Sequence, residues 1–192
     1  VAPDDVYLLS DPYVAGGNHL PDWVIARPVF VSGSRVAFAC NRAHQSDIGG
    51  GAAGTYNSSA TEIFQERIRL PPLKLVDKGV LREDLWQLLL INSRTPHYLD
   101  GDLRAMIGST RMGGEMIAER IEAMGTATGA RYFDSIMDHA DRLARSEVTR
   151  LADGTYHGED GFDDDCFEPV AVPIKVTITI AGDTLTVDFT GS

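Results

Sequence analysis

Residues 17–51 read GNHLPDWVIARPVFVSGSRVAFACNRAHQSDIGGG and contain two apolar runs on either side of the turn signal Ser32-Gly33-Ser34. The first run covers residues 23–31 and the second covers residues 35–41. Apolar runs of this length around a glycine-centred turn are typical of a β-hairpin. A tight turn at Gly33 also fixes the register, so that the residues at the open end of the hairpin are predicted to face one another.

Two polar clusters of the same spacing, His19-x-x-Asp22 and His44-x-x-Asp47, lie at that open end. The register places Asp22 opposite His44, and opposed Cβ atoms in an antiparallel pair are about 4.5–5.5 Å apart. Two imidazoles and one carboxylate form a ligand set that leaves open positions and suits Zn, Mn or Fe. We therefore expect His19, Asp22 and His44 to bind a divalent metal ion. Asp47 is expected to be a further ligand, to orient a ligating imidazole, or to move protons.

Each cluster taken alone has a simpler explanation. Strand ends are solvated and therefore often carry His and Asp, and an Asp after Pro is ordinary turn chemistry. The convergence of both clusters in one register favours the metal site over two unrelated strand ends.

Three further groups near the hairpin are candidates for chemistry. Gly49, Gly50 and Gly51 follow the second cluster, and their N–H groups are expected to bind an anion unless the loop is only a connector. Ser59-Ala60-Thr61-Glu62 has the spacing of a capping box, which explains its acidic residue and leaves Glu66, one helical turn later, as the better acid–base candidate. Asp11 precedes Pro12 and is either a turn former or a further catalytic carboxylate.

Composition restricts the partners. The formal net charge of −11 argues against nucleic acid and anionic membranes, which require clustered Lys and Arg. No apolar run is long enough to span a membrane, and no phosphate-binding loop motif is present. The two cysteines, Cys40 and Cys166, suggest a reducing compartment and hence a cytoplasmic protein, and Cys40 is expected to be buried beside Val36 and Phe38.

The remaining pattern predicts a single α+β domain over residues 1–192. It combines antiparallel β-hairpins or a sheet with a long helical hairpin packed alongside. Strands are predicted over residues 6–9, 23–31, 35–41, 73–76, 172–180 and 184–189, and helices over residues 63–66, 84–91, 100–124 and 133–151. The chain opens on Val1 with a strand almost at once, and we expect it to be an interior fragment of a longer protein.

Short stretches distributed along the whole chain resemble the hydantoinase B/5-oxoprolinase family, which includes N-methylhydantoinase B subunits and the related large subunits of acetone and acetophenone carboxylases. The matching stretches are SDPY (10–13), GNHLPD (17–22), NRAHQSDIGG (41–50), ATEIFQE (60–66), LPP (70–72), NSRTP (92–96), GDLRA (101–105), DGTY (153–156) and VDFTG (187–191). In the carboxylase branch the metal ligands match His19, Asp22 and His44, the same three that the register predicts.

The resemblance implies a metal-bearing subunit of an ATP-dependent enzyme. A hydantoinase A-type ATPase subunit is expected to activate a small cyclic amide by phosphorylation within a hetero-oligomer, and this chain to hydrolyse the activated substrate. Arg94, in the matching stretch 92–96, is expected to join the glycine loop in binding anion or substrate. The alternatives are a subunit of an ATP-dependent ketone carboxylase, separable by its dependence on bicarbonate, and an inactive structural or assembly module of the family.

Overall fold

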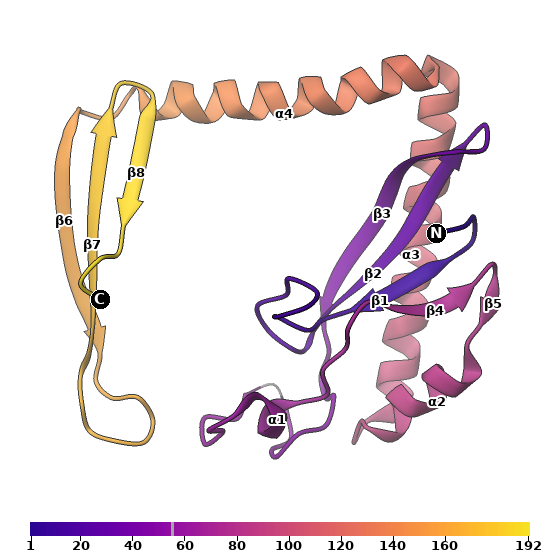
Figure 1. Cartoon of the computed structure of the whole chain (residues 1–192), viewed down its shortest axis with the longest axis horizontal. Coiled ribbons are helices and arrows are strands. Elements are labelled where there is room, and N and C mark those ends of the chain that lie inside the picture. Colours follow the sequence, from indigo (N-terminus) through magenta and orange to yellow (C-terminus); the bar gives the residue numbers. More distant parts are fainter. Residues whose placement is uncertain (55) are drawn as a thin grey trace. The chain divides into compact units, whose positions relative to one another are not determined.

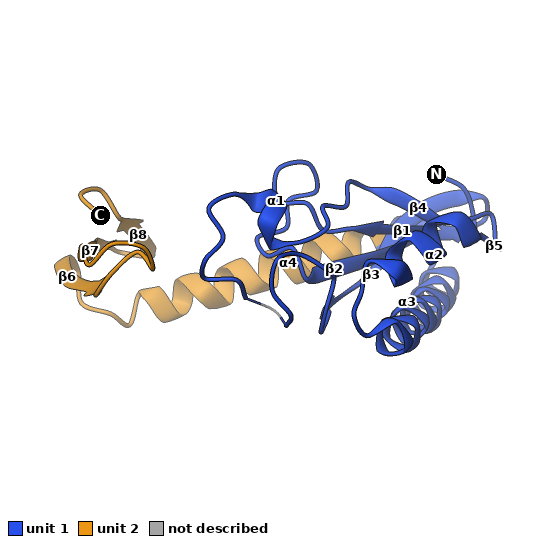
Figure 2. Cartoon of the chain, turned by 90° about the horizontal axis from the view of Figure 1, so that it is seen from below, with its two compact units in different colours: residues 1–129 blue, residues 130–192 orange. Residues whose placement is uncertain are grey.

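The computed structural model describes residues 1–54 and 56–192 (Figure 1), which divide into two compact units. The first unit covers residues 1–129 and the second covers residues 130–192 (Figure 2). Antiparallel sheets and helices confirm the predicted α+β class. The assignment of the whole chain to one domain stays a prediction, because a compact unit need not fold by itself.

The first unit is built on a mixed set of strands and helices in which every strand pair is antiparallel. Its sheet has five strands in the order β3-β2-β1-β4-β5. The elements are β1 (Val6–Leu9), β2 (Asp22–Val31), β3 (Ser34–His44), α1 (Ile63–Glu66), β4 (Leu73–Asp77), β5 (Val80–Leu81), α2 (Glu83–Ile91) and α3 (Pro96–Met124).

The β2–β3 hairpin has the predicted register. Ser32 and Gly33 form its turn with positive φ angles of 50° and 78°, the conformation that a tight hairpin turn requires. A bulge between Val29 and Phe30 shifts the pairing by one residue. Beyond the bulge the strands stay paired down to Asp22 and His44, which face one another as the sequence predicts.

The core of this unit lies between the sheet and the helices α2 and α3. Alternate strand residues point into it, as the period of two requires. The core contains Val6, Leu8, Leu20, Trp23, Ile25, Ile48, Leu70, Leu75, Val76, Trp86, Leu89, Leu99, Leu103 and Met106. Helix α3 approaches β2 and β3 at Gly114, where an added Cβ would make ordinary contacts with Val29 Cγ2 at 3.5 Å and Ala39 Cβ at 3.6 Å.

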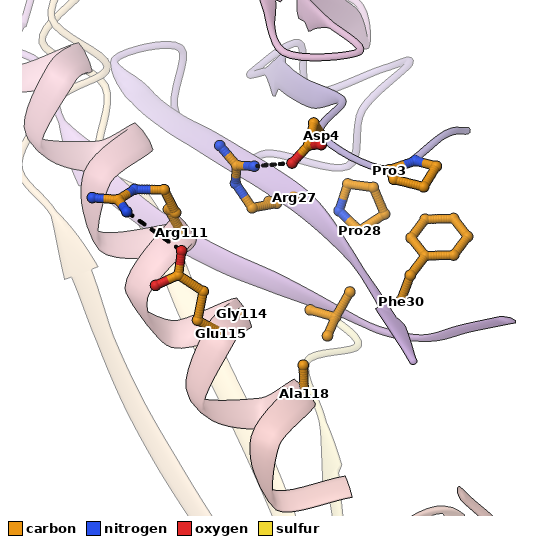
Figure 3. A pocket seen from close by; sticks show the side chains of 10 residues that line it. Pro3, Asp4, Arg27, Pro28, Phe30, Arg111, Gly114, Glu115 and Ala118 are labelled. Atoms are coloured by element: carbon orange, nitrogen blue, oxygen red, sulfur yellow. Dashed lines mark hydrogen bonds and ion pairs between the residues drawn. The ribbon is translucent and has the colours of Figure 1, made fainter. Parts of the chain in front are cut away.

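A shallow cavity of about 230 Å³ opens beside this contact, between α3 and β2 (Figure 3). Arg27 forms an ion pair with Asp4 at 3.7 Å on one side of it, and Arg111 pairs with Glu115 at 3.4 Å on the other. None of the predicted site residues lines this cavity. Because each arginine is paired with a carboxylate, the charged side chains around this cavity neutralise one another.

The expectation that Cys40 is buried is wrong. Adjacent residues of a strand point to opposite faces, and Ala39 is the buried residue that points toward α3. Cys40 therefore lies on the other face of β3 together with Phe38, and both are exposed. The apolar neighbours that suggested a core position share that exposed face.

The second unit contains a three-stranded antiparallel sheet in the order β6-β7-β8. Its strands are β6 (Gly154–Phe162), β7 (Val172–Ala181) and β8 (Thr184–Asp188), and the last two form the predicted hairpin around Gly182. Helix α4 (Thr126–Val148) begins just after Gly125 and carries exposed apolar side chains, among them Ile136, Met137 and Leu143. In the first unit, helix α3 packs on strands β2 and β3 of the sheet. No helix of residues 1–54 and 56–192 combines the length and apolar character needed to cross a bilayer.

Candidate metal centre

His19, Asp22 and His44 converge at the open end of the β2–β3 hairpin. Each offers one ligand atom, and these three atoms all lie within 4.8 Å of one another. Nδ1 of His44 lies 2.8 Å from Oδ1 of Asp22, and the ring centroids of His19 and His44 are 5.1 Å apart. The predicted convergence is therefore present, from the loop before β2, the first residue of β2 and the last residue of β3.

Local backbone bonds and buried neighbours set the directions of these side chains. The N–H of Asp22 donates to the carbonyl oxygen of His19 at 3.0 Å, which closes a tight turn at the start of β2. Leu20 and Trp23 point into the core. Because adjacent strand residues point to opposite faces, burial of Trp23 turns Asp22 outward toward His44.

The donor chemistry of the trio fits a divalent cation. Donor atoms bound to one Zn²⁺ at about 2.0–2.2 Å lie at most about 4.4 Å apart, so small side-chain rotations bring the three atoms into coordinating range. The imidazoles are at the surface or half-buried, and the side chain of Asp22 is 23% exposed, so an ion has access. Two imidazole nitrogens with one carboxylate favour Zn, Fe or Mn over the all-oxygen ions Ca²⁺ and Mg²⁺.

Glu66 and His19 border the same two cavities. The larger cavity, of about 490 Å³, is also lined by Glu62, and the smaller one, of about 250 Å³, is also lined by Tyr56. Glu66 is half-buried at the end of α1. A carboxylate that shares two cavities with one of the converging imidazoles lies where a ligand beside the trio would meet an acid–base group.

The predicted capping box at the start of α1 is wrong. Glu62 is the N-cap residue, but its side chain makes no capping hydrogen bond. The N–H of Thr61 instead donates to Oε1 of Gln65 at 2.8 Å. The side chain of Glu62 therefore does not cap α1, so capping does not explain this residue. Both Glu62 and Glu66 line the larger cavity, and Glu66 also lines the smaller one.

Tyr56 is a neighbour of the trio that the sequence did not suggest. Its ring stacks on His19 with centroids 5.1 Å apart and planes 25° apart, although the residue is 78% exposed. An exposed aromatic residue within a run of small residues was the available signal. The stack limits the rotation of the His19 ring.

Asp47 has different partners from the ones predicted. Its side chain is 5% exposed and accepts hydrogen bonds from the N–H of Gly49, the N–H of Arg94 and the Nη1 of Arg94, at 3.1, 2.9 and 3.0 Å. Burial by itself raises the pKa of Asp47, but these hydrogen bonds outweigh burial and hold the pKa below its usual value. Asp47 is thus an ionised anchor for Arg94 and the glycine loop.

The glycine loop is closely packed against the segment that carries Glu66. Gly50 has a φ of +84°, and a Cβ there would collide with the carbonyl oxygen of Glu66. The N–H of Gly49 donates to Asp47, and the N–H of Gly51 donates to the carbonyl oxygen of Gln65 at 2.8 Å. Use of these two N–H groups for an external anion would therefore require existing bonds to break.

Arg94 is engaged with the same loop. Its Nη1 donates to the carbonyl oxygens of Gly49 and Ala52, and its Nη2 donates to the carbonyl oxygen of Gly50 at 2.8 Å. With the Asp47 bond, these contacts make Arg94 a clamp on the loop. Its predicted role in binding anion or substrate stays a prediction.

Asp11 forms the turn that follows β1. Its Oδ1 accepts the N–H groups of Tyr13 and Val14 at 2.8 and 3.0 Å, and its Oδ2 accepts the Nε–H of Arg69. The bond from Arg69, followed by those two N–H bonds, holds the pKa of the buried Asp11 below its usual value. These contacts are those of a turn former, and the role of Asp11 as a catalytic carboxylate stays a prediction.

A protein-family model described as hydantoinase B/oxoprolinase matches residues 1–192. The caprolactamase subunit beta of Pseudomonas jessenii is 33% identical over 183 residues, which make up 95% of this chain and 31% of that subunit. The crystal structure of the ATP-dependent caprolactamase from the same organism has a TM-score of 0.89 at 33% identity, covering 97% of this chain and 32% of that chain. The chain thus spans about a third of the length of these relatives.

A second solved structure has a similar fold with a more distant sequence. The nucleotide-free structure of acetone carboxylase has a TM-score of 0.84 at 19% identity and covers 98% of this chain and 26% of that chain. At this identity the likeness concerns the fold alone.

Proposed function

The chain belongs to the hydantoinase B/oxoprolinase family, and from this premise we propose that it carries the metal-dependent hydrolytic site of an ATP-dependent cyclic amide hydrolase. The observation that carries the proposal is the convergence of His19, Asp22 and His44 beside cavities that Glu66 also borders. The caprolactamase relative, whose named substrate class is a cyclic amide, supports the same reaction type.

The trio would hold a divalent ion, Zn, Mn or Fe. When bound, such an ion supplies a Lewis acid for a carbonyl oxygen and lowers the pKa of water. His19 and His44 would act as neutral imidazoles and Asp22 as a carboxylate. Tyr56 would keep the His19 ring in its binding orientation through the stack.

Glu66 is the residue that we propose moves protons. It takes a proton from the attacking water and later gives it to the amide nitrogen as the ring opens, which is general base and then general acid catalysis. Its half-buried position favours this role because partial burial keeps bulk water from competing for the proton. Asp47 is engaged with Arg94 and supports the loop behind Glu66.

We further propose that the substrate reaches this site after activation by a hydantoinase A-type ATPase subunit in a hetero-oligomer. The relative is named a beta subunit, and its structure is titled ATP-dependent. Phosphorylation of the amide oxygen makes the amide carbon more electrophilic. Attack of water and cleavage of the C–N bond then open the ring and leave an acyl phosphate, which a second water hydrolyses to the carboxylate of the amino acid and inorganic phosphate. The small cyclic amide is therefore a substrate of both subunits in turn.

The test uses the full-length protein that contains this chain, mixed with its ATPase partner. We expect ATP-dependent formation of a ring-opened amino acid from a lactam or hydantoin, independent of bicarbonate. Bicarbonate-dependent carboxylation of a ketone would instead support the carboxylase alternative. Absence of both reactions in a metal-loaded complex would favour the assembly module.

Glu62 provides a matched control for Glu66. We expect Glu66→Gln to lower kcat by about 100-fold or more, the usual contribution of a positioned acid–base group. Glu62 is the N-cap residue of the same short helix and lines the same larger cavity, and we expect Glu62→Gln to change kcat by less than about threefold. Equal losses in the two variants would rule out a specific proton-transfer role for Glu66.

A further inference from the structure

A second cavity of the first unit, of about 400 Å³, lies among the strands β2, β4 and β5 and the helices α2 and α3. Its apolar lining comes from Val76, Leu81, Trp86 and Ile107, and its charged lining comes from Asp4, Arg27, Arg104 and Arg111. We call it the arginine cavity. No residue of the metal trio lines it, and neither does Glu66. Its size and mixed lining are typical of sites for small organic molecules, which occupy about 300–1,000 Å³.

Arg27 is the least exposed of these arginines and has unused donor groups. It lies on the face of β2 that carries the buried Trp23 and Ile25, and 14% of its side chain is exposed. Within residues 1–54 and 56–192 its polar partner is Asp4, whose Oδ1 lies 3.7 Å from Nη1, too far for a hydrogen bond. Because buried polar groups are normally hydrogen-bonded, the donors of Arg27 require an explanation.

The Nη end of Arg27 is the part that a ligand can reach. Nε is a buried atom without a hydrogen-bond partner. In the described part of the chain Nη1 and Nη2 make no hydrogen bond either, but they are not buried. Arg27 lines both the arginine cavity and the cavity of Figure 3, so its accessible N–H groups border the space between β2 and α3.

The lining of the arginine cavity carries more positive than negative charge. Three guanidinium groups against the carboxylate of Asp4 leave an excess of two positive charges, in a chain whose formal net charge is −11. Asp100 and Glu115, which pair with Arg104 and Arg111, do not line it. In the cavity of Figure 3, by contrast, the charges of the lining residues balance.

Two of the existing ion pairs are weak enough for an entering anion to compete with them. The carboxylate of Asp4, which faces Arg27, is exposed, and so are both side chains of the pair between Arg111 and Glu115. Exposed ion pairs contribute little, because water solvates both charges. Arg27 and Arg111 can therefore exchange these partners for a ligand.

Arg104 is held more firmly than the other two arginines. It donates two hydrogen bonds to Asp100, at 2.8 and 3.0 Å, and its guanidinium lies 5.0 Å from the ring centroid of Trp86. Arg104 thus adds positive charge to the cavity, while Arg27 and Arg111 supply the available donors.

We propose that the arginine cavity binds a small organic anion, with the oxyanion on Arg27 and Arg111 and an apolar body against Val76, Leu81 and Ile107. Guanidinium groups present paired N–H donors that match both carboxylate and phosphate. An inorganic ion would leave the apolar lining unused, and a neutral molecule would leave the donors of Arg27 without an anion. This site does not depend on the proposed hydrolysis, so the failure of either proposal leaves the other standing.

Arg120 provides the matched control. It is an exposed arginine of α3, like Arg111, but it lines neither the arginine cavity nor the cavity of Figure 3. Substitution by methionine removes one positive charge and keeps a long side chain. At the largely buried Arg27, an apolar side chain of similar volume is also the replacement that a folded protein tolerates best.

The experiment is a titration of the full-length protein at constant ionic strength, followed by ligand-observed NMR. The probes are hexanoate, hexyl phosphate and hexanamide, which share an apolar chain and differ in the headgroup. We expect Arg27→Met to weaken binding of at least one anionic probe by about tenfold or more, the loss typical of a charge-assisted hydrogen bond. Arg120→Met should weaken it by less than about twofold. Hexanamide should bind more weakly than the anions and should not lose affinity in Arg27→Met.

The outcomes identify the headgroup. Binding that depends on Arg27 for hexanoate alone indicates a carboxylate ligand, for hexyl phosphate alone a phosphate monoester, and for both an oxyanion site without preference. The metal trio is intact in every variant, so any anion bound there contributes equally to all titrations.

Three results would overturn the inference. They are equal affinities of wild type and Arg27→Met, a loss in Arg120→Met as large as that in Arg27→Met, and no binding of either anion to wild type, the result expected if a protein segment fills the cavity. If thermal melts show that Arg27→Met does not fold, Arg111→Met replaces it. A loss of about threefold or more that is absent from Arg120→Met then supports the site, and equal affinities refute it.

Discussion

Asp22 and Asp47 end two motifs of the same spacing, His19-x-x-Asp22 and His44-x-x-Asp47, yet they have opposite surroundings. Asp22 has a half-buried side chain whose described hydrogen-bond partner is the ring of His44. Asp47 is almost fully buried and accepts three hydrogen bonds from Arg94 and Gly49. The same residue types at the same spacing therefore produce one open, ion-accessible carboxylate and one closed, fully satisfied carboxylate.

This difference separates a site from its support. A carboxylate with spare acceptor positions beside two imidazoles is suited to bind a cation. A buried carboxylate that already has its partners is suited to hold a loop, and here it holds the glycines packed behind Glu66. Four predictions test this comparison, in which Asp22 belongs to an open metal site and Asp47 holds the loop behind it.

Metal content is where we expect the largest difference. Asp22→Asn and His44→Ala should lower the affinity for Zn²⁺ or Mn²⁺ by more than about 100-fold, because losing a ligand costs more than losing a residue that orients one. Asp47→Asn should retain the wild-type content, since Asp47 contacts other residues. Elemental analysis after dialysis measures both, and equal metal content in wild type and His44→Ala would refute the trio as a metal site.

Stability should show the reverse order. Asp47→Asn should lower the free energy of unfolding by about 2 kcal/mol, because it leaves two backbone N–H groups and Arg94 with a poorer acceptor. Asp22→Asn should change it by less than about 1 kcal/mol in metal-free protein, as expected for a partly exposed pair. Denaturant unfolding measures both values, and a larger loss for Asp22→Asn would reverse the comparison.

Acid should reduce the stability gap between wild type and Asp47→Asn. The pKa of Asp47 is lowered in the folded protein, so its ionised form adds stability above the unfolded pKa of about 4. This contribution is lost as the pH falls through the lower folded pKa. The two unfolding free energies should therefore converge below about pH 4, and a constant gap down to acid unfolding would contradict the ionised anchor.

Tyr56 should have the smallest effect, and it concerns the open site alone. Tyr56→Ala removes the stack on His19 and should weaken metal binding by about three- to tenfold, the range of one aromatic contact. Tyr56→Phe keeps the ring and should bind metal like wild type. Competition with a chelator of known affinity measures the difference, and equal weakening by Phe and Ala would assign the effect to the hydroxyl group.

The hairpin and its trio were predictable because they depend on local rules. The turn at Gly33 and the alternation of the apolar runs fix which strand residues meet, and Asp22 meets His44 as expected. The bulge at Val29 was not foreseen, but it preserves this pairing. The exposure of Cys40 was missed because alternation says which residues share a face and not which face is covered.

The support of the site could not be predicted, because its contacts join residues distant in sequence. Arg94 lies 47 residues from Asp47. Arg67 donates to the carbonyl oxygen of Gly49, which is 18 residues away. The glycines suggested an anion-binding loop. The structure gives their small size another cause, because a Cβ at Gly50 would collide with the carbonyl oxygen of Glu66 and a Cβ at Gly49 with that of Asn92. Nothing in the local pattern indicates that two arginines clamp this loop.

By itself, the sequence determined that two imidazoles and a carboxylate meet at one hairpin end, because register follows from a turn and a period of two. Only the tertiary structure decided which of the two matching aspartates stays open and which becomes a buried anchor. That choice depends on burial and on hydrogen-bond partners that arrive from elsewhere in the chain. Spacing brings side chains together locally, and long-range packing determines which of them keep a free position for a ligand.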